Sequence, residues 1–110
     1  MSEPLTVNEM LEGQRALQDH YRDQWGGLDP AKGREQLLWM VIEAGEAADI
    51  IKKRGDDVIL HDPEQRAHFV EELCDVLMYL GDVMLCYDIT AQELAEIYRK
   101  KRDRNLHRWD

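Results

Sequence analysis

Two pairs of acidic residues in this chain have the types and the spacing expected of a metal site. Glu43 and Glu46 form the first pair, and Glu72 and Asp75 form the second. Each pair is spaced i, i+3, which places both carboxylates on the same face of a helix. Carboxylate oxygens are hard ligands, so four of them without cysteine or histidine at the same spacing favour Mg²⁺, with Mn²⁺ as a substitute.

The residues around these pairs are almost entirely apolar. No other charged residue lies between positions 37 and 48, and only Asp82 accompanies Asp75 between positions 73 and 87. Solvated acids on the polar face of a helix are the alternative, but these segments have no broad polar face. Acidic pairs buried together would repel each other and resist ionisation, and a divalent cation removes both problems. We therefore expect a metal site.

Asp82 shares a helix stripe with the second pair. Glu72, Asp75, Tyr79 and Asp82 follow one another at i, i+3, i+7 and i+10, so all four lie on one face. Asp82 could be an outer metal ligand or an acceptor behind the ligands, and a contact with another helix explains it equally well.

Four helices are predicted to position these residues, mainly from the signals at their ends. Capping boxes, in which a hydroxyl and a carboxylate bind the free amides of a first turn, open segments 6–23 and 90–104. An aspartate followed by a proline opens segments 29–53 and 62–87. No run of alternating β-branched residues suggests a strand. These segments and their short connections favour an all-α fold, an antiparallel four-helix bundle.

The composition limits the class of protein. The chain has 110 residues, 44% of them hydrophobic, and a net charge of −9 at pH 7, which suits a single domain over residues 1–110. The acidic balance argues against polymeric nucleic acid and anionic membranes as partners. No apolar run is long enough to span a bilayer. Cys74 and Cys86 have no metal-binding spacing and are expected to be core residues of a cytoplasmic protein.

The segment 62–87 also predicts self-association. Apolar residues occur at nearly every angle around this helix, so it must be packed on most sides. Three short neighbours cannot easily cover it, and an exposed remainder would be a large apolar patch. We therefore expect a homo-oligomer.

The two acidic motifs also match a known family. Glu43-Ala44-Gly45-Glu46 followed by Glu72-Leu73-Cys74-Asp75 resembles the ExxE…ExxD signature of the MazG-like nucleoside triphosphate pyrophosphohydrolases, members of the all-α NTP pyrophosphatase superfamily. The resemblance covers residues 8–109, and the basic tail 101–108 is similar to the family's closing segment. Two features differ from the family: Ile42 stands where many members carry another glutamate, and the chain is one module rather than a tandem pair.

The resemblance implies hydrolysis of a ribo- or deoxyribonucleoside triphosphate between its α- and β-phosphates, to give the monophosphate and pyrophosphate. Glu43, Glu46, Glu72 and Asp75 would be both the metal ligands and the catalytic residues, with Mg²⁺ neutralising charge on the phosphates. One of the four carboxylates would accept the proton of the attacking water, and the sequence does not identify which. The family forms dimers and tetramers in which a second subunit borders the site. Its biological role would be nucleotide-pool housekeeping.

The basic tail holds candidates for phosphate binding. Residues 99–108 carry six of the 14 basic residues of the chain. Interaction of cations with a helix C-terminus explains about half of this cluster. By resemblance to the family's tail, Lys101, Asn105 and Arg108 would contact phosphates, and Lys53 is a weaker candidate.

Aromatic residues are the candidates for base binding. Trp25, Trp39 and Tyr79 offer ring faces on which a base could stack, although a tryptophan within a helical bundle, such as Trp39, more often belongs to the core. Trp25 precedes Gly26-Gly27 and is expected in a loop, where it would suit a lid or a pocket wall. Gln14 and Gln18 could read the edge of a base, but solvated positions on the first helix are the stronger expectation for them.

Two other classes of protein fit parts of the pattern. A non-catalytic acidic module could dimerise through the apolar segment 62–87 without binding Mg²⁺ or releasing pyrophosphate. A di-iron carboxylate bundle would need Glu-x-x-His pairs, and no histidine lies three residues after Glu43, Glu46, Glu71 or Glu72. The hydrolase is the prediction, and the dimerisation module is its alternative.

Overall fold

The computed structural model describes residues 3–110, and this part of the chain is helical with no strand. Its helices are α1 (Val7–His20), α2 (Arg22–Trp25), α3 (Pro30–Arg54), α4 (Asp56–His61), α5 (Pro63–Cys86) and α6 (Ala91–Leu106). The predicted all-α class is thus confirmed. None of the described helices has the length and apolar character needed to cross a membrane.

The predicted helix starts are confirmed by their caps. Thr6 and Glu9 form both hydrogen bonds of the capping box that opens α1. The side chains of Asp29, Asp62 and Thr90 each accept hydrogen bonding from first-turn amides, of α3, α5 and α6 respectively. At α6 only the bond accepted by Thr90 is present, so the predicted capping box is confirmed in half. These bonds satisfy backbone donors that have no partner within the helix.

The two short helices, α2 and α4, are not predicted by the sequence. The first predicted segment breaks early, because α1 ends at His20 and the chain turns at Tyr21 before α2 begins. The stacked rings of Tyr21 and Trp25, 4.6 Å apart, hold this short turn together. At the other break, Gly55 has a φ of +87° and ends α3, and α4 fills the connection to α5.

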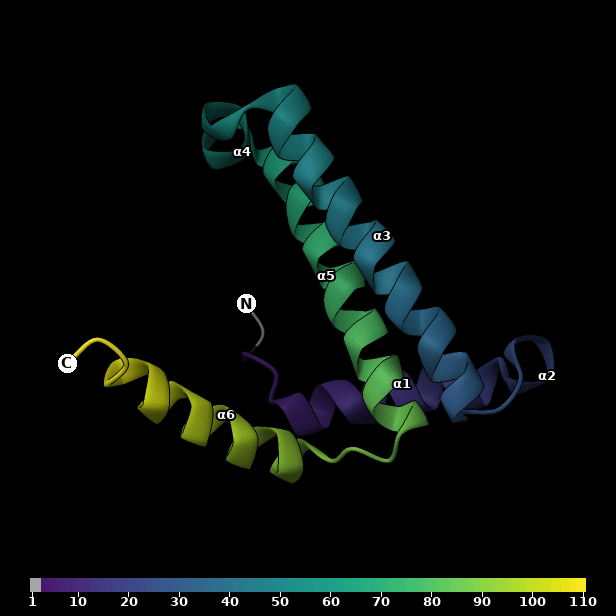
Figure 1. Cartoon of the computed structure of the whole chain (residues 1–110). Coiled ribbons are helices and arrows are strands. Elements are labelled where there is room, and N and C mark those ends of the chain that lie inside the picture. Colours follow the sequence, from purple (N-terminus) through teal and green to yellow (C-terminus); the bar gives the residue numbers. More distant parts are fainter. Residues whose placement is uncertain (1–2) are drawn as a thin grey trace.

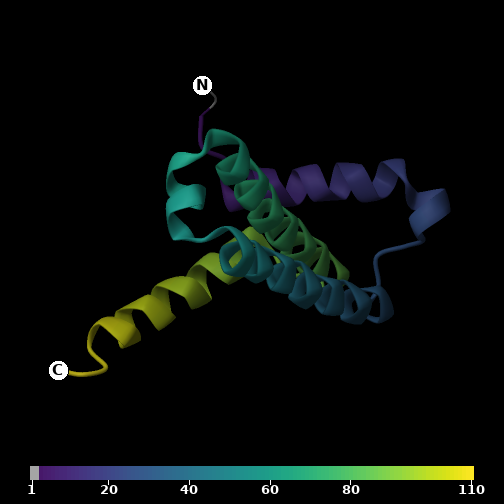
Figure 2. The same cartoon turned by 90° about the horizontal axis from the view of Figure 1, so that it is seen from above.

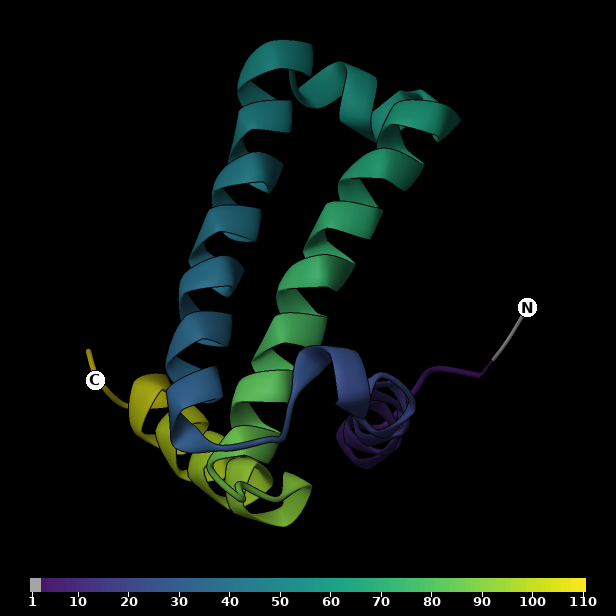
Figure 3. The same ribbon diagram turned by 90° about the vertical axis from the view of Figure 1, so that its right-hand side faces the viewer.

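The long helices α3 and α5 form an antiparallel hairpin with α4 at its tip (Figures 1 and 3). Their close approach at the open end depends on Gly33. A Cβ atom on this glycine would lie 2.6 Å from Cε2 of Tyr87, so no larger residue fits without displacing the ring. The Tyr87 hydroxyl also donates a hydrogen bond of 3.3 Å to the carbonyl of Pro30. These contacts fix the register of the two helices.

Helix α1 crosses the C-terminal part of α5 at an angle (Figure 2). Leu11 of α1 packs there with Met84 and Leu85 in a small buried core. A Cβ atom at Gly81 would lie 3.0 Å from Cγ of Gln14, so the glycine lets α1 approach α5 closely. The backbone of α6 approaches only that of α1, although Leu94 near its start packs against the small core, and the helix then extends away from the hairpin (Figure 1).

The chain alone therefore does not close the predicted four-helix bundle. Its accessible surface is 8710 Å², whereas a globular monomer of 12.9 kDa exposes about 6300 Å². The radius of gyration is 16.5 Å, against about 13 Å for a compact domain of this length. The antiparallel α3–α5 pair is as predicted, but α6 does not pack along the hairpin as the fourth helix of a bundle would.

Much of the apolar surface of the hairpin is exposed. Within the chain α5 is not packed on most sides, so its own helices do not supply the expected cover, and cover by another subunit stays a prediction. Of the two cysteines, Cys86 is buried as predicted, whereas Cys74 is exposed and the prediction of a core position is wrong for it. The half-exposed apolar side chains of the hairpin include Leu38, Val41, Val70, Leu73 and Leu77.

Candidate metal centre and adjoining cavity

Three of the four predicted metal ligands converge where α3 and α5 lie side by side. One carboxylate oxygen from each of Glu43, Glu46 and Glu72 lies within 4.8 Å of the other two. The i, i+3 spacing directs both glutamates of α3 toward Glu72 of α5. Glu43 and Glu72 are partly buried and Glu46 is exposed. We call these three residues the glutamate cluster.

The glutamate cluster lacks a positive partner among the described residues. Oε2 of Glu72 is buried and has no hydrogen-bond partner there, which is costly for a carboxylate oxygen. Removal from water and the neighbouring carboxylates of Glu72 and Glu46 raise the pKa of Glu43 from 4.5 to about 7. An oxygen-only donor set with one unpaired buried oxygen fits a hard divalent cation such as Mg²⁺ or Mn²⁺.

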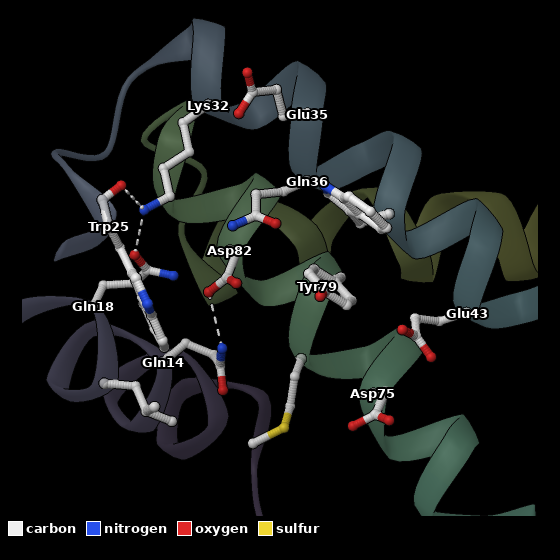
Figure 4. Close-up of a pocket in the computed structure, with 13 residues that line it drawn as sticks. Gln14, Gln18, Trp25, Lys32, Glu35, Gln36, Glu43, Asp75, Tyr79 and Asp82 are labelled. Carbon is white, nitrogen blue, oxygen red and sulfur yellow. Dashed lines mark hydrogen bonds between the residues drawn. The ribbon is translucent and has the colours of Figure 1, made fainter. Parts of the chain in front are cut away.

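Asp75, the fourth predicted ligand, lies outside the glutamate cluster. It is one turn beyond Glu72 on α5, and it lines a cavity together with Glu43 (Figure 4). Glu43 therefore belongs both to the cluster and to the cavity wall, and Asp75 extends the acidic surface from one to the other.

The cavity has a volume of about 590 Å³ and lies between α1, α3 and α5, with α2 at one end. All three aromatic candidates line it: Trp25, Trp39 and Tyr79 (Figure 4). Trp39 is 50% exposed, so the expectation of a core position is wrong for it. Trp25 lines the cavity as expected of a pocket wall, but it belongs to the short helix α2 and not to a loop. Burial and the nearby carboxylates raise the pKa of Tyr79, and its hydroxyl is neutral at physiological pH.

One side of the cavity is a buried polar network, which we call the polar floor. Nε2 of Gln14 donates a hydrogen bond of 2.8 Å to Oδ1 of Asp82, and this carboxylate is only 5% exposed. Nζ of Lys32 donates to Oε1 of Gln18 at 2.7 Å and to the carbonyl of Trp25 at 3.0 Å. Figure 4 shows these hydrogen bonds as dashed lines. The polar floor consists of Gln14, Gln18, Lys32 and Asp82.

Asp82 therefore contacts another helix, which is one of the two roles that the sequence left open. It is outside the glutamate cluster. Burial raises the pKa of the Asp82 carboxyl, whereas the hydrogen bond from Gln14, the nearby amide of Gln18 and the charge of Lys32 act in the opposite direction. The network thus compensates part of the cost of burying this acid.

The polar floor differs from what the sequence predicts. Gln14 and Gln18 are buried, so the expectation that they are solvated is wrong, and the sequence gives no prediction for Lys32. A signal was present, because Leu11, Gln14 and Gln18 follow one another at i, i+3 and i+7 and therefore share the buried face of α1. Polar residues on a buried face need partners, and the residues of α3 and α5 provide them.

The predicted phosphate ligands do not reach the glutamate cluster within one chain. Lys101 and Asn105 line a shallow groove on α6, and the backbone of this helix approaches neither α3 nor α5. Arg108 lies over the ring of Trp109, 5.4 Å from its centroid. Lys53 forms an exposed ion pair of 2.8 Å with Asp49.

Comparison with protein families, with curated proteins and with solved structures finds no match to this chain. No relative therefore supplies a function or a set of site residues. A functional assignment depends on the glutamate cluster, on the cavity beside it, and on the sequence motifs that contain them.

Proposed function

We propose that this chain is a Mg²⁺-dependent nucleoside triphosphate pyrophosphohydrolase of the MazG-like type. It would cleave between the α- and β-phosphates and release the monophosphate and pyrophosphate, as a housekeeping enzyme of the cytoplasmic nucleotide pool. The observation that carries the proposal is the glutamate cluster with its unpaired Glu72 oxygen, next to a cavity with aromatic walls. The resemblance of the ExxE and ExxD motifs to that family supplies the reaction.

The acidic residues have distinct tasks in this proposal. Glu43, Glu46 and Glu72 would hold the cation, and Asp75 would bind it from the cavity side. When bound, Mg²⁺ supplies positive charge for the phosphates and lowers the pKa of a water molecule. A carboxylate oxygen of the cluster that remains free would accept the proton of the attacking water. The aromatic side chains of the cavity would stack on the base.

A second copy of the chain would cover the exposed apolar surface of the hairpin and bring its basic tail to the glutamate cluster. The surface exposed beyond that of a compact monomer, about 2400 Å², is what one subunit buries in an extensive obligate dimer. The exposed apolar stripes of α3 and α5 supply such a surface. The acidic hairpin and the basic residues 99–108 are also complementary in charge. We place Lys101, Asn105 and Arg108 of one subunit near the glutamate cluster of the other, in a homodimer or homotetramer.

Pyrophosphate release from the common NTPs and dNTPs in the presence of Mg²⁺ tests the activity. Glu72→Gln should lower kcat/KM at least about a hundredfold, because the variant loses a charged ligand. Glu71→Gln, an exposed neighbour outside the cluster, is the matched control and should stay within about twofold of wild type. Light scattering measures the assembly. A dimer that releases no pyrophosphate from any substrate would leave the non-catalytic dimerisation module as the better description.

A further inference from the structure

We propose that the cavity selects a base with an exocyclic amino group, and that Asp82 makes the selection. The inference rests on the proposed function in that the cavity is taken to receive the base of a nucleotide. It adds the class of base, which follows from the hydrogen-bonding groups of the polar floor.

The two amides of the polar floor are each held in one orientation by a charged neighbour. An ammonium group can only donate, so Lys32 must face Oε1 of Gln18, as its distance of 2.7 Å indicates. A carboxylate can only accept, so Asp82 must face Nε2 of Gln14. The amide nitrogen of Gln18 also acts on Asp82, so the amide group left for a ligand is the Oε1 acceptor of Gln14.

Asp82 has acceptor positions left for a ligand. A carboxylate provides about four of them, and the structure assigns Gln14 to Oδ1 alone. Asp82 also lines the cavity, although it is 5% exposed. An amino group donates to such an acceptor, whereas a carbonyl oxygen in the same place is repelled by it. Cytosine, adenine and guanine carry an amino group, whereas uracil and hypoxanthine present a carbonyl where cytosine and adenine have theirs.

The position of Asp82 fits this role. Asp75, Tyr79 and Asp82 face the cavity from successive turns of α5, and Asp75 and Asp82 are about 10 Å apart along the helix axis. The acidic end at Asp75 adjoins the glutamate cluster, and the polar floor lies at the opposite end. A nucleotide with its phosphates at the cluster would therefore direct its base edge toward Asp82, past Tyr79 (Figure 4). Trp39 also lines the cavity and could stack on the base.

Binding of nucleoside monophosphates without Mg²⁺ tests the inference independently of catalysis. The probes are two pairs that differ at the amino group, dCMP against dUMP and dAMP against dIMP. Quenching of tryptophan fluorescence reports binding, because Trp25 and Trp39 line the cavity. We expect the amino-bearing member of each pair to bind at least about tenfold more tightly, the discrimination typical of one buried hydrogen bond to a charged group. Equal affinities, a reversed order or no binding of either member would overturn the inference.

The variant Asp82→Asn assigns the preference to this residue. Asparagine keeps an oxygen for Gln14 and presents an N–H donor to the cavity, so the preference should disappear or reverse. Asp57→Asn, which replaces an exposed aspartate of α4, is the control and should keep it. A folded Asp82→Asn protein with the wild-type preference would refute the role of Asp82. If the variant does not fold, the binding of the paired monophosphates by the wild-type protein still tests the base preference. Selective binding of monophosphates without pyrophosphate release would refute the hydrolase and leave the base selection standing.

Discussion

Acidification should weaken Mg²⁺ binding through Glu43. In the metal-free protein, partial burial and the neighbouring carboxylates raise the pKa of Glu43 to about 7, and a cation competes with the proton for this carboxylate. The ionised fraction of a group with this pKa is about three-quarters at about pH 7.5 and about one-tenth at about pH 6. If one proton leaves Glu43 when Mg²⁺ binds, the apparent Kd for Mg²⁺ should be about eightfold higher at the lower pH.

Calorimetric titration of the metal-free protein with MgCl₂ at the two pH values measures this ratio. Helical circular dichroism at each pH shows whether the chain is folded. Glu43→Gln should bind Mg²⁺ more weakly and lose most of the pH dependence, because an amide does not titrate. Glu71→Gln should keep the wild-type ratio. A wild-type Kd that changes less than about twofold across this interval would refute the reasoning, since it would mean that no proton leaves Glu43 when the cation binds.

The same shift predicts how pH affects stability. A carboxyl whose pKa is raised by folding stabilises the folded state below its unfolded value of 4.5, and this contribution is lost as the pH rises through about 7. Without Mg²⁺, wild type should therefore lose more thermal stability than Glu43→Gln between about pH 5 and about pH 8. Addition of Mg²⁺ should raise the wild-type Tm more at the higher pH. Equal pH profiles of the two proteins would contradict this account.

Three further predictions concern assembly and packing. Equal amounts of inactive Glu72→Gln and Arg108→Ala, denatured and refolded together, should recover about a quarter of wild-type pyrophosphate release if each site combines the cluster of one subunit with the tail of the other in a dimer. Leu77→Glu places a charge on the exposed apolar stripe of α5, and light scattering should show a smaller assembly. Gly33→Ala should lower the free energy of unfolding in urea by about 1–3 kcal/mol, because its methyl group would overlap the Tyr87 ring.

Each of these predictions has a control. No recovery in the refolded mixture would mean that tail and cluster of the same chain act together, whereas an Arg108→Ala variant that is active alone would mean that the tail does not act. Lys52→Glu changes an exposed charge at the end of α3 and should leave the assembly unchanged. Gly13→Ala meets open space within the chain and should raise stability by about 0.5–1 kcal/mol, as alanine does at an exposed helix position. Equal effects of the two glycine substitutions would contradict the close packing at Gly33.

The helix starts and the shared face of Glu43 and Glu46 could be predicted because they depend on local sequence. Thr6 with Glu9, and Asp29 before Pro30, bind first-turn amides a few residues away, so nothing distant is needed to identify them. The spacing of Glu43 and Glu46 puts both on one helix face whatever surrounds the helix. Local patterns of this kind survive in the folded chain because they use only neighbours in sequence.

The position of Asp75 and the polar floor could not be predicted in the same way. Asp75 has the same spacing from Glu72 as Glu46 has from Glu43, but the register of α5 against α3 leaves it outside the cluster. Gln14 meets Asp82 only because Gly81 lets α1 approach α5. Register and close approach depend on packing between distant residues, and helical periodicity contains no information about either.

The hydrogen bond between Gln14 and Asp82 joins residues 68 positions apart in the chain, and this separation affects the order of folding. Closing a long loop costs more entropy than closing a short one, so local contacts form first. The α3–α5 hairpin, whose tip is the short helix α4, can therefore assemble before α1 docks. In the native state α1 can also detach with less cost than the hairpin can open. Transient unfolding should then dismantle the cavity while the glutamate cluster persists, and amide hydrogen exchange should be faster in α1 than in α3 and α5.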